Sequence, residues 1–157
     1  MPNNYREPRL EHLYDMHADL ETQTIGQTPS GMRQIFIVKG GTINGPSGKG
    51  EILPGGGDWA IGRSDGALQL DVRATVKMDD GALIYVTYAG ILAADPPVFA
   101  RILSGDDVPL NEYYFYTNPM FQTADKRYAW MNKVIAVGRG RALAAAVEYR
   151  VWALRNS

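Results

Sequence analysis

The residues with the clearest potential for chemistry are an acidic and a basic side chain two positions apart, Asp71 and Arg73. In an extended strand two such residues share a face, close enough to form an ion pair or to grip one polar ligand. Tyr85 lies in the next apolar segment and adds a phenol group. We therefore take Asp71, Arg73 and Tyr85 as candidate catalytic residues. The alternative is an ordinary solvated strand face.

A second group of candidates is aromatic. The segment NEYYFYTNPMFQT, residues 111–123, places five aromatic residues close together and ends near an amide side chain. Such a density of rings is typical of a barrel core or of a pocket wall, and buried phenols need hydrogen-bond partners. As ligand-binding residues we predict Asp58, Trp59, Tyr88, Tyr114, Tyr116, Phe121, Gln122, Trp130 and Asn132.

Glycine is concentrated in one stretch, Gly40 to Asp58, which holds eight of the 17 glycines. GPSGKG resembles a phosphate-binding loop, but Ile43 and Gly50 occupy positions where that motif requires Gly and Ser or Thr. GGGDWA lacks the strand-to-helix context of a dinucleotide fingerprint. The run instead predicts a rim of turns that delivers Asp58 and Trp59 toward a barrel mouth.

The remaining composition excludes several kinds of chemistry. There is no cysteine, and the only histidines, His12 and His17, fall on opposite faces of a predicted strand, so we expect no metal site and no cofactor. A net charge of -1 without a basic cluster argues against nucleic-acid binding. Neither a signal peptide nor a membrane-spanning run is recognisable, which predicts a cytoplasmic protein.

The elements that must position these residues are mainly strands. LQLDVRATVK, residues 68–77, alternates apolar and polar side chains, and the turn MDDG separates it from ALIYVTYAG, residues 82–90. Further strands are predicted at residues 10–20, 33–39, 111–117, 133–137 and 142–154, with GRGR, residues 138–141, as the turn between the last two. One short helix is expected after Asp95 as its cap and ends at Gly105. A second short helix is expected after Thr123, which would cap it.

Seven or more strands in 157 residues predict a single all-β domain, residues 1–157, with one or two short helices. We favour an antiparallel β-barrel over a sandwich because closure removes exposed sheet edges.

Four segments in this order resemble uncharacterised protein family three hundred and eleven, a bacterial and fungal domain of unknown function. The segments are GGTINGPSGKGEILPGGGDW, LDVRATVKMDDGALIYVTYAG, YFYTNPMFQT and YAWMNKVIAVGRG. The resemblance implies a lipocalin-like or allene-oxide-cyclase-like barrel that often self-associates, so a homo-oligomer, with a dimer favoured. It implies no agreed activity or cofactor. The recurring family positions match Asp58, Trp59, Asp71, Arg73, Asp80, Tyr85, Trp130 and Asn132.

This chain departs from the family pattern at two places. Tyr116 stands where relatives commonly carry arginine, and Gln122 stands where they carry glutamate. Because an amide does not accept a proton near neutral pH, a mechanism that uses that glutamate as a base cannot operate here. Asp58 and Asp71 are the carboxylates that remain.

Three functions from different classes are open at this stage. The first is a barrel that binds a small, largely apolar molecule, with Arg73 holding a carboxylate or enolate and the glycine run forming the mouth. The second is a cofactor-independent isomerase or cyclase in which Asp71 is base or acid and Tyr85 or Tyr116 donates a proton. The third is a self-associating barrel without a ligand, in which Asp58 caps a turn and Asn132 satisfies backbone groups.

Overall fold

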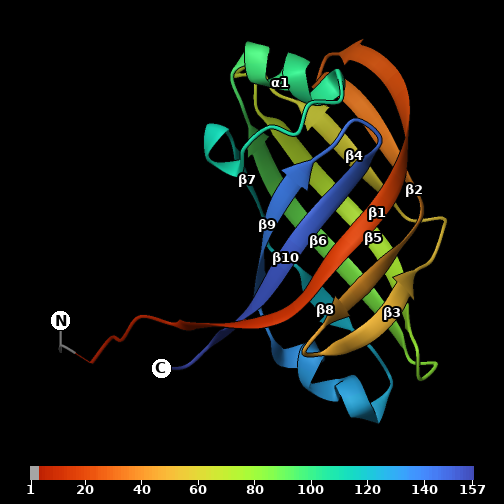
Figure 1. The fold of residues 1–157 in the computed structure, drawn as a ribbon, viewed down its shortest axis with the longest axis vertical. Coiled ribbons are helices and arrows are strands. Elements are labelled where there is room, and N and C mark those ends of the chain that lie inside the picture. Colours follow the sequence, from red (N-terminus) through yellow and green to blue (C-terminus); the bar gives the residue numbers. More distant parts are fainter. Residues whose placement is uncertain (1–3) are drawn as a thin grey trace.

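The computed structural model describes residues 4–157 and contains ten strands joined in one antiparallel sheet (Figure 1). The strands are β1 (Arg9–Thr28), β2 (Gly31–Gly45), β3 (Gly48–Ile52), β4 (Gly57–Gly62), β5 (Leu68–Met78), β6 (Leu83–Ala93), β7 (Tyr114–Thr117), β8 (Met120–Gln122), β9 (Ala136–Ala142) and β10 (Ala146–Arg155). The pairings run from β1 through β2, β4, β5, β6, β7, β9 and β10 back to β1. The predicted antiparallel β-barrel is therefore confirmed.

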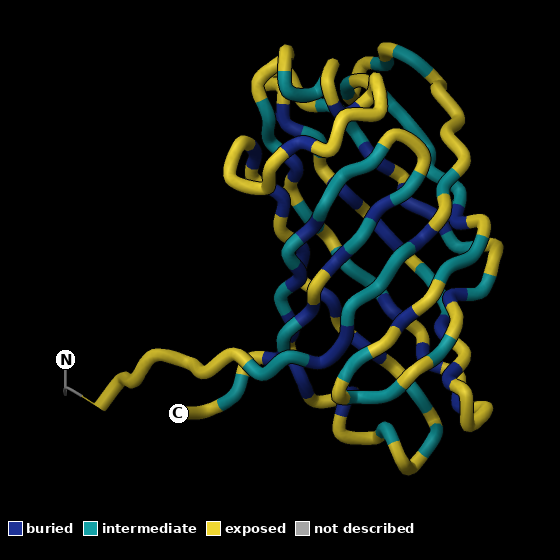
Figure 2. The backbone as a smooth tube through the Cα atoms, viewed as in Figure 1, coloured by how far each residue is buried: buried dark blue, intermediate teal, exposed yellow. Residues whose placement is uncertain are grey.

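Alternation along the strands decides what faces the interior. In β5, Leu70, Val72 and Val76 are buried, whereas Gln69 and Lys77 are exposed. The same two-residue period appears along many of the strands as an alternation of more buried and more exposed residues (Figure 2). The core is thus the inside of the barrel.

Short helices lie at the two ends of the barrel (Figure 1). The helix α1 (Pro96–Leu103) follows Asp95, has proline in its first turn, and is followed by Gly105 at φ +96°, as the sequence predicted. The 3-10 helix η1 (Leu110–Glu112) precedes β7. The amphipathic α1 buries Ile102, so it contributes to the core at its end.

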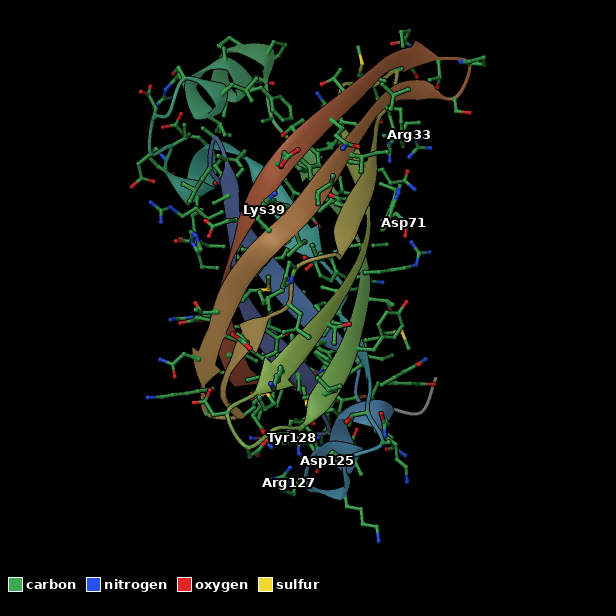
Figure 3. All side chains as sticks on the ribbon, turned by 90° about the vertical axis from the view of Figure 1, so that its right-hand side faces the viewer. Arg33, Lys39, Asp71, Asp125, Arg127 and Tyr128 are labelled. Atoms are coloured by element: carbon green, nitrogen blue, oxygen red, sulfur yellow. The ribbon has the colours of Figure 1, made fainter. Side chains whose placement is uncertain are left out.

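At the opposite end, the 3-10 helix η2 (Lys126–Lys133) is tied to the β5–β6 turn. The hydroxyl of Tyr128 donates to Asp80 Oδ2 over 2.6 Å, and Arg127 Nη1 lies 3.4 Å from the same oxygen. Asp125, and not the predicted Thr123, caps this helix by accepting from the backbone N–H of Arg127 (Figure 3). The helix therefore closes the barrel through polar contacts around Asp80.

The prediction of a turn at GRGR is wrong. Residues 138–141 lie inside β9, and the chain turns between β9 and β10 at residues 143–145. Gly138 and Gly140 face the interior, where a Cβ on Gly140 would collide with the ring of Phe115 and one on Gly138 would lie 2.5 Å from Thr117 Oγ1. These glycines make room for neighbouring side chains rather than for a turn.

The glycine run does not form the mouth of the barrel. It contributes the end of β2, all of β3 and the start of β4, and β3 lies toward the end of the barrel away from α1 (Figure 1). A Cβ on Gly50 would lie 2.6 Å from the carbonyl oxygen of Lys77, and one on Gly56 would lie 2.5 Å from that of Arg73. The glycines permit close approach of strands.

Candidate functional site

The barrel encloses a cavity of about 330 Å³ in its interior. Inward side chains of the strands line its walls, and Phe99, Ile102 and Leu103 of α1 line the end beneath the helix. Leu103 is 73% exposed although it borders the cavity. Gly66 and Ala144, which also border the cavity, are exposed as well. The cavity therefore opens at the α1 end.

One ionisable carboxyl group, that of Asp58 in β4, belongs to this cavity wall. The register places Asp58 opposite Phe36 of β2 and Val72 of β5, so its neighbours are apolar. Its Oδ1 accepts a hydrogen bond of 2.9 Å from the backbone N–H of Asp71. Asp58 is only 9% exposed, and burial raises the pKa of its carboxyl to about 6.

Two phenols, one from β6 and one from β10, line the same cavity as Asp58. Tyr88 of β6 and Tyr149 of β10 both line the cavity, and their rings meet edge to face with centroids 5.5 Å apart. Burial raises the pKa of each hydroxyl most, and the negative charge of Asp58 raises both further. A hydrogen-bonding interaction between the two hydroxyls raises the pKa of Tyr149 and lowers that of Tyr88. The phenols remain protonated near neutral pH.

The ring of Phe115 fixes the position of Tyr149. The two rings meet edge to face at 5.3 Å, and Gly140 leaves the space that Phe115 occupies. Tyr14 also lines the cavity, and burial raises the pKa of its hydroxyl, with a smaller contribution from Tyr88. The polar part of the cavity is thus held by close-packed aromatic side chains.

The cavity contains no basic side chain among the described residues. No lysine, arginine or histidine borders it, and the described part of the chain contains no group of three histidine, cysteine, aspartate or glutamate residues placed to hold a metal. An anionic ligand would therefore enter without a counter-charge, which is costly in an apolar interior. The site favours a molecule that carries no negative charge.

The structure places Asp71 and Arg73 on the outer surface of the barrel. Arg73 Nη1 lies 3.2 Å from Asp71 Oδ1, and both side chains are at least half exposed. Figure 3 shows Asp71 pointing away from the interior. The guanidinium of Arg73 also lies 5.6 Å from the ring centre of Trp59, which is outside as well. The expected proximity of Asp71 and Arg73 is real, but the pair lies outside the cavity.

Of the predicted aromatic wall, only part is inside. Tyr85, Tyr114 and Tyr116 point outward, and Arg139 stacks on Tyr116 at 4.9 Å. Phe121 is buried and packs against Tyr14, but it lies outside the set that lines the cavity. The reason is the strict alternation of residues 113–121, in which every odd-numbered residue is buried and every even-numbered one is exposed.

The other predicted residues lie near η2 or on the outer surface. Gln122 is exposed in β8 opposite Tyr85, and Trp130 packs beneath Arg155 at 5.2 Å. Asn132 accepts from the backbone N–H of Thr123 at 2.8 Å and donates to its carbonyl at 2.9 Å. Asn132 thus satisfies backbone groups in the segment that leads into η2, a structural role.

The structure therefore brings Asp58 and Tyr88 together from the predicted set and adds Tyr149, which sequence reasoning missed. A signal for Tyr149 was present. It is a phenol between Val147 and Val151 on the apolar face of the last strand. A single polar group within an otherwise apolar strand face indicates a special environment.

These features define a class of protein: an antiparallel β-barrel whose cavity is lined by one buried carboxyl group and three phenols. The chain belongs to the family described as protein of unknown function DUF3237, which it matches over residues 8–154. It is 35% identical over 136 residues to a UPF0311 protein of Clostridium acetobutylicum, covering 85% of this chain and 86% of that protein. The family resemblance seen in the sequence is confirmed.

Structural comparison agrees with this assignment. A beta-barrel like protein from Acinetobacter baumannii superposes with a TM-score of 0.84 and 34% identity, covering 98% of this chain and 99% of that chain. A more distant relative is the hydroalkoxylation enzyme phnH of Penicillium herquei, 26% identical over 132 residues, which are 83% of this chain and 73% of that protein. No helix in residues 4–157 has the length and apolar character needed to cross a membrane.

Proposed function

We propose that this protein is a cofactor-independent enzyme that transfers protons within an uncharged small organic molecule bound inside the barrel, as an isomerase or cyclase. The observation that carries the proposal is the Asp58 carboxyl group in an apolar cavity, with one oxygen held by the Asp71 backbone. Among the described residues, no protein hydrogen bond involves its other oxygen, Oδ2, which leaves that atom for a substrate.

The altered acidity of Asp58 supports this role. A general acid–base group works best when its pKa lies near the working pH, and burial raises the pKa of Asp58 to about 6. Asp58 can therefore take a proton from one atom of a substrate and return it to another. Such a transfer rearranges bonds without net oxidation or reduction, so it requires no second substrate.

The relationship to phnH is consistent with the proposal. Hydroalkoxylation adds an O–H bond across a carbon–carbon double bond, which moves one proton from oxygen to carbon and closes a ring when both groups belong to one molecule. At this level of identity the likeness supports only the general type of reaction. Asp58 would accept the hydroxyl proton and the alkene carbon would receive one.

A direct test uses hydrogen–deuterium exchange. β-Tetralone, a neutral bicyclic ketone that enolises easily, is incubated with the protein in deuterium oxide, and loss of its α-proton signal is followed by NMR. The native protein should accelerate exchange above the buffer rate. Asp58→Asn should lower that acceleration about 100- to 10,000-fold, the usual contribution of a general base.

Asp71→Asn is the matched control. Its carboxyl lies on the outer surface, while the backbone N–H that holds Asp58 is unchanged. This variant should exchange β-tetralone at the native rate. Full exchange by Asp58→Asn, or equal losses in the two variants, would refute the assignment. Retained binding of β-tetralone without exchange by any form of the protein would instead indicate a binding barrel that performs no reaction.

A further inference from the structure

Three of the polar groups that line the cavity differ in what they offer a ligand. Asp58 presents a carboxylate oxygen that accepts a hydrogen bond, whereas Tyr88 and Tyr149 present hydroxyl groups that stay protonated and can donate. A base and a pair of donors in one cavity can act on two different atoms of a single substrate.

The sheet register brings these groups to one level of the barrel. Asp58 lies opposite Val72, and Val72 lies opposite Tyr88, so two adjacent pairings connect them across β4, β5 and β6. Tyr149 reaches the same level from β10 and touches Tyr88 ring to ring at 5.5 Å. All three residues line the same cavity, and the negative charge of Asp58 raises the pKa of both phenols.

The charge balance of the cavity restricts the ligand further. Arg73, on the neighbouring strand β5, is on the other side of the wall, paired with Asp71 and stacked on Trp59. An anionic ligand would therefore meet the Asp58 carboxylate with no basic residue bordering the cavity. Desolvating such an anion is strongly unfavourable.

On the basis of the proposed proton transfer, we propose that the substrate is an uncharged hydroxy-carbonyl compound of about two fused rings. Its hydroxyl donates to Asp58 Oδ2, and its conjugated carbonyl accepts from the Tyr88 and Tyr149 phenols. When Asp58 withdraws the hydroxyl proton, conjugation moves negative charge to the carbonyl oxygen, where the two phenols stabilise it. The cavity of about 330 Å³ sets the size, because it is at the lower end of ordinary ligand sites.

Three probes of nearly equal shape test this ligand class: an acetylnaphthol, acetylnaphthalene, which lacks the hydroxyl, and the corresponding hydroxynaphthoate, which is an anion at neutral pH. Affinities are measured by isothermal titration calorimetry with the full chain at pH 7. The acetylnaphthol should bind best. Loss of the hydroxyl should weaken binding about 5- to 50-fold, since that group donates to a charged acceptor. The hydroxynaphthoate should bind at least about 10-fold more weakly than the acetylnaphthol.

Conservative variants test the two donors. Tyr88→Phe and Tyr149→Phe each remove one hydroxyl and keep the ring, so each should weaken acetylnaphthol binding about 2- to 10-fold. Tyr85→Phe, on the same strand as Tyr88 but on the outer face, is the control and should bind as the native protein does. Circular dichroism establishes that each variant is folded.

Three results would overturn the assignment: absence of acetylnaphthol binding, hydroxynaphthoate binding as tight as that of the acetylnaphthol, or unchanged affinity in both Tyr88→Phe and Tyr149→Phe. These binding measurements are independent of turnover. If the acetylnaphthol preference holds while Asp58→Asn still exchanges β-tetralone, the ligand class stands and the proton-transfer role of Asp58 fails. If Asp58→Asn loses the exchange of β-tetralone but the acetylnaphthol is not preferred, the proton-transfer role of Asp58 stands and this ligand class fails.

Discussion

The two faces of the β4–β5 wall give the same kind of side chain opposite properties. Asp58 faces the interior, with burial raising the pKa of its carboxyl, and Asp71 faces solvent beside Arg73. A single hydrogen bond from the Asp71 backbone to Asp58 Oδ1 joins the two residues through the wall. The acidity of a carboxyl group in this barrel therefore depends on which face the residue occupies, because only the interior removes water from the group.

The outer face carries most of the charge. Arg150 holds the pKa of Asp15 below its usual value, and Arg141 and His17 do the same for Glu148. These pairs are solvated and satisfy one another, so none of them is left with a free group for chemistry. The inner face holds fewer ionisable groups, and burial raises the pKa of Asp58 and of the three tyrosines that line the cavity.

The largest difference between the faces should be in packing. Phe115→Ala empties space beside Tyr149 and Gly140 in the interior, and we expect a loss of about 3–5 kcal/mol in the free energy of unfolding. Tyr114→Ala, one residue earlier on the outer face, should cost less than about 1 kcal/mol. Urea unfolding of both variants measures this contrast, and similar losses would contradict the assignment of faces.

A smaller effect should appear in the dependence of stability on pH. The folded-state pKa of Asp58, about 6, exceeds its ordinary value of 3.8, so folding favours the protonated carboxyl. Its stabilising contribution is fully present below pH 3.8 and is lost as the pH rises through about 6, by about 2–3 kcal/mol. Unfolding free energies between pH 4 and pH 7 should show this fall in the native protein relative to Asp58→Asn.

The outer carboxylates supply a contrast of opposite sign. The folded pKa values of Asp15 and Glu148 are lowered, so their stabilising contributions are present above the unfolded pKa and are lost as the pH falls through the folded values. Asp58→Asn should leave that acid-side loss intact. A native curve parallel to that of Asp58→Asn from pH 4 to pH 7 would show that the Asp58 carboxyl is not buried as described.

The smallest effect should come from the exposed ion pair. Because Asp71 and Arg73 are at least half exposed, their interaction should contribute less than about 1 kcal/mol to folding. A double-mutant cycle with Asp71→Asn and Arg73→Gln measures the coupling, which should shrink further at high salt. A coupling above about 2 kcal/mol would indicate a structural importance that the exposed geometry does not explain.

Much of the fold could be predicted from local pattern. The two-residue period of residues 68–77 predicted β5 within one residue, and Asp95, Pro96 and Gly105 bounded α1. The prediction of a turn at GRGR was wrong because glycine occurs both in turns and where a neighbouring side chain needs space. Only the position of Phe115 shows that Gly140 is needed for space. Strand β1 also shifts register between His12 and Tyr14, and Leu10 is exposed although strict alternation would put it on the same face as the buried Tyr14.

The candidate site was less predictable. Asp58 and Tyr88 could be named from the sequence, but they were grouped with Trp59 and Tyr85, which face the other way. Alternation separates residues into two faces without saying which face a polar residue prefers. Asp71 and Arg73 drew attention because they are charged and close in sequence, although charged residues usually occupy the solvated face.

The sequence by itself determined that the chain forms an all-β barrel and which residues alternate, because strand periodicity and turn residues are local properties. It also restricted the ionisable groups of the cavity, since one carboxyl and three phenols are the ionisable side chains among its mainly apolar lining. Only the tertiary structure decided that Asp58, Tyr88 and Tyr149 meet. These residues come from three strands far apart in the chain, and closure of the sheet brings them into one water-poor space where their acidities change.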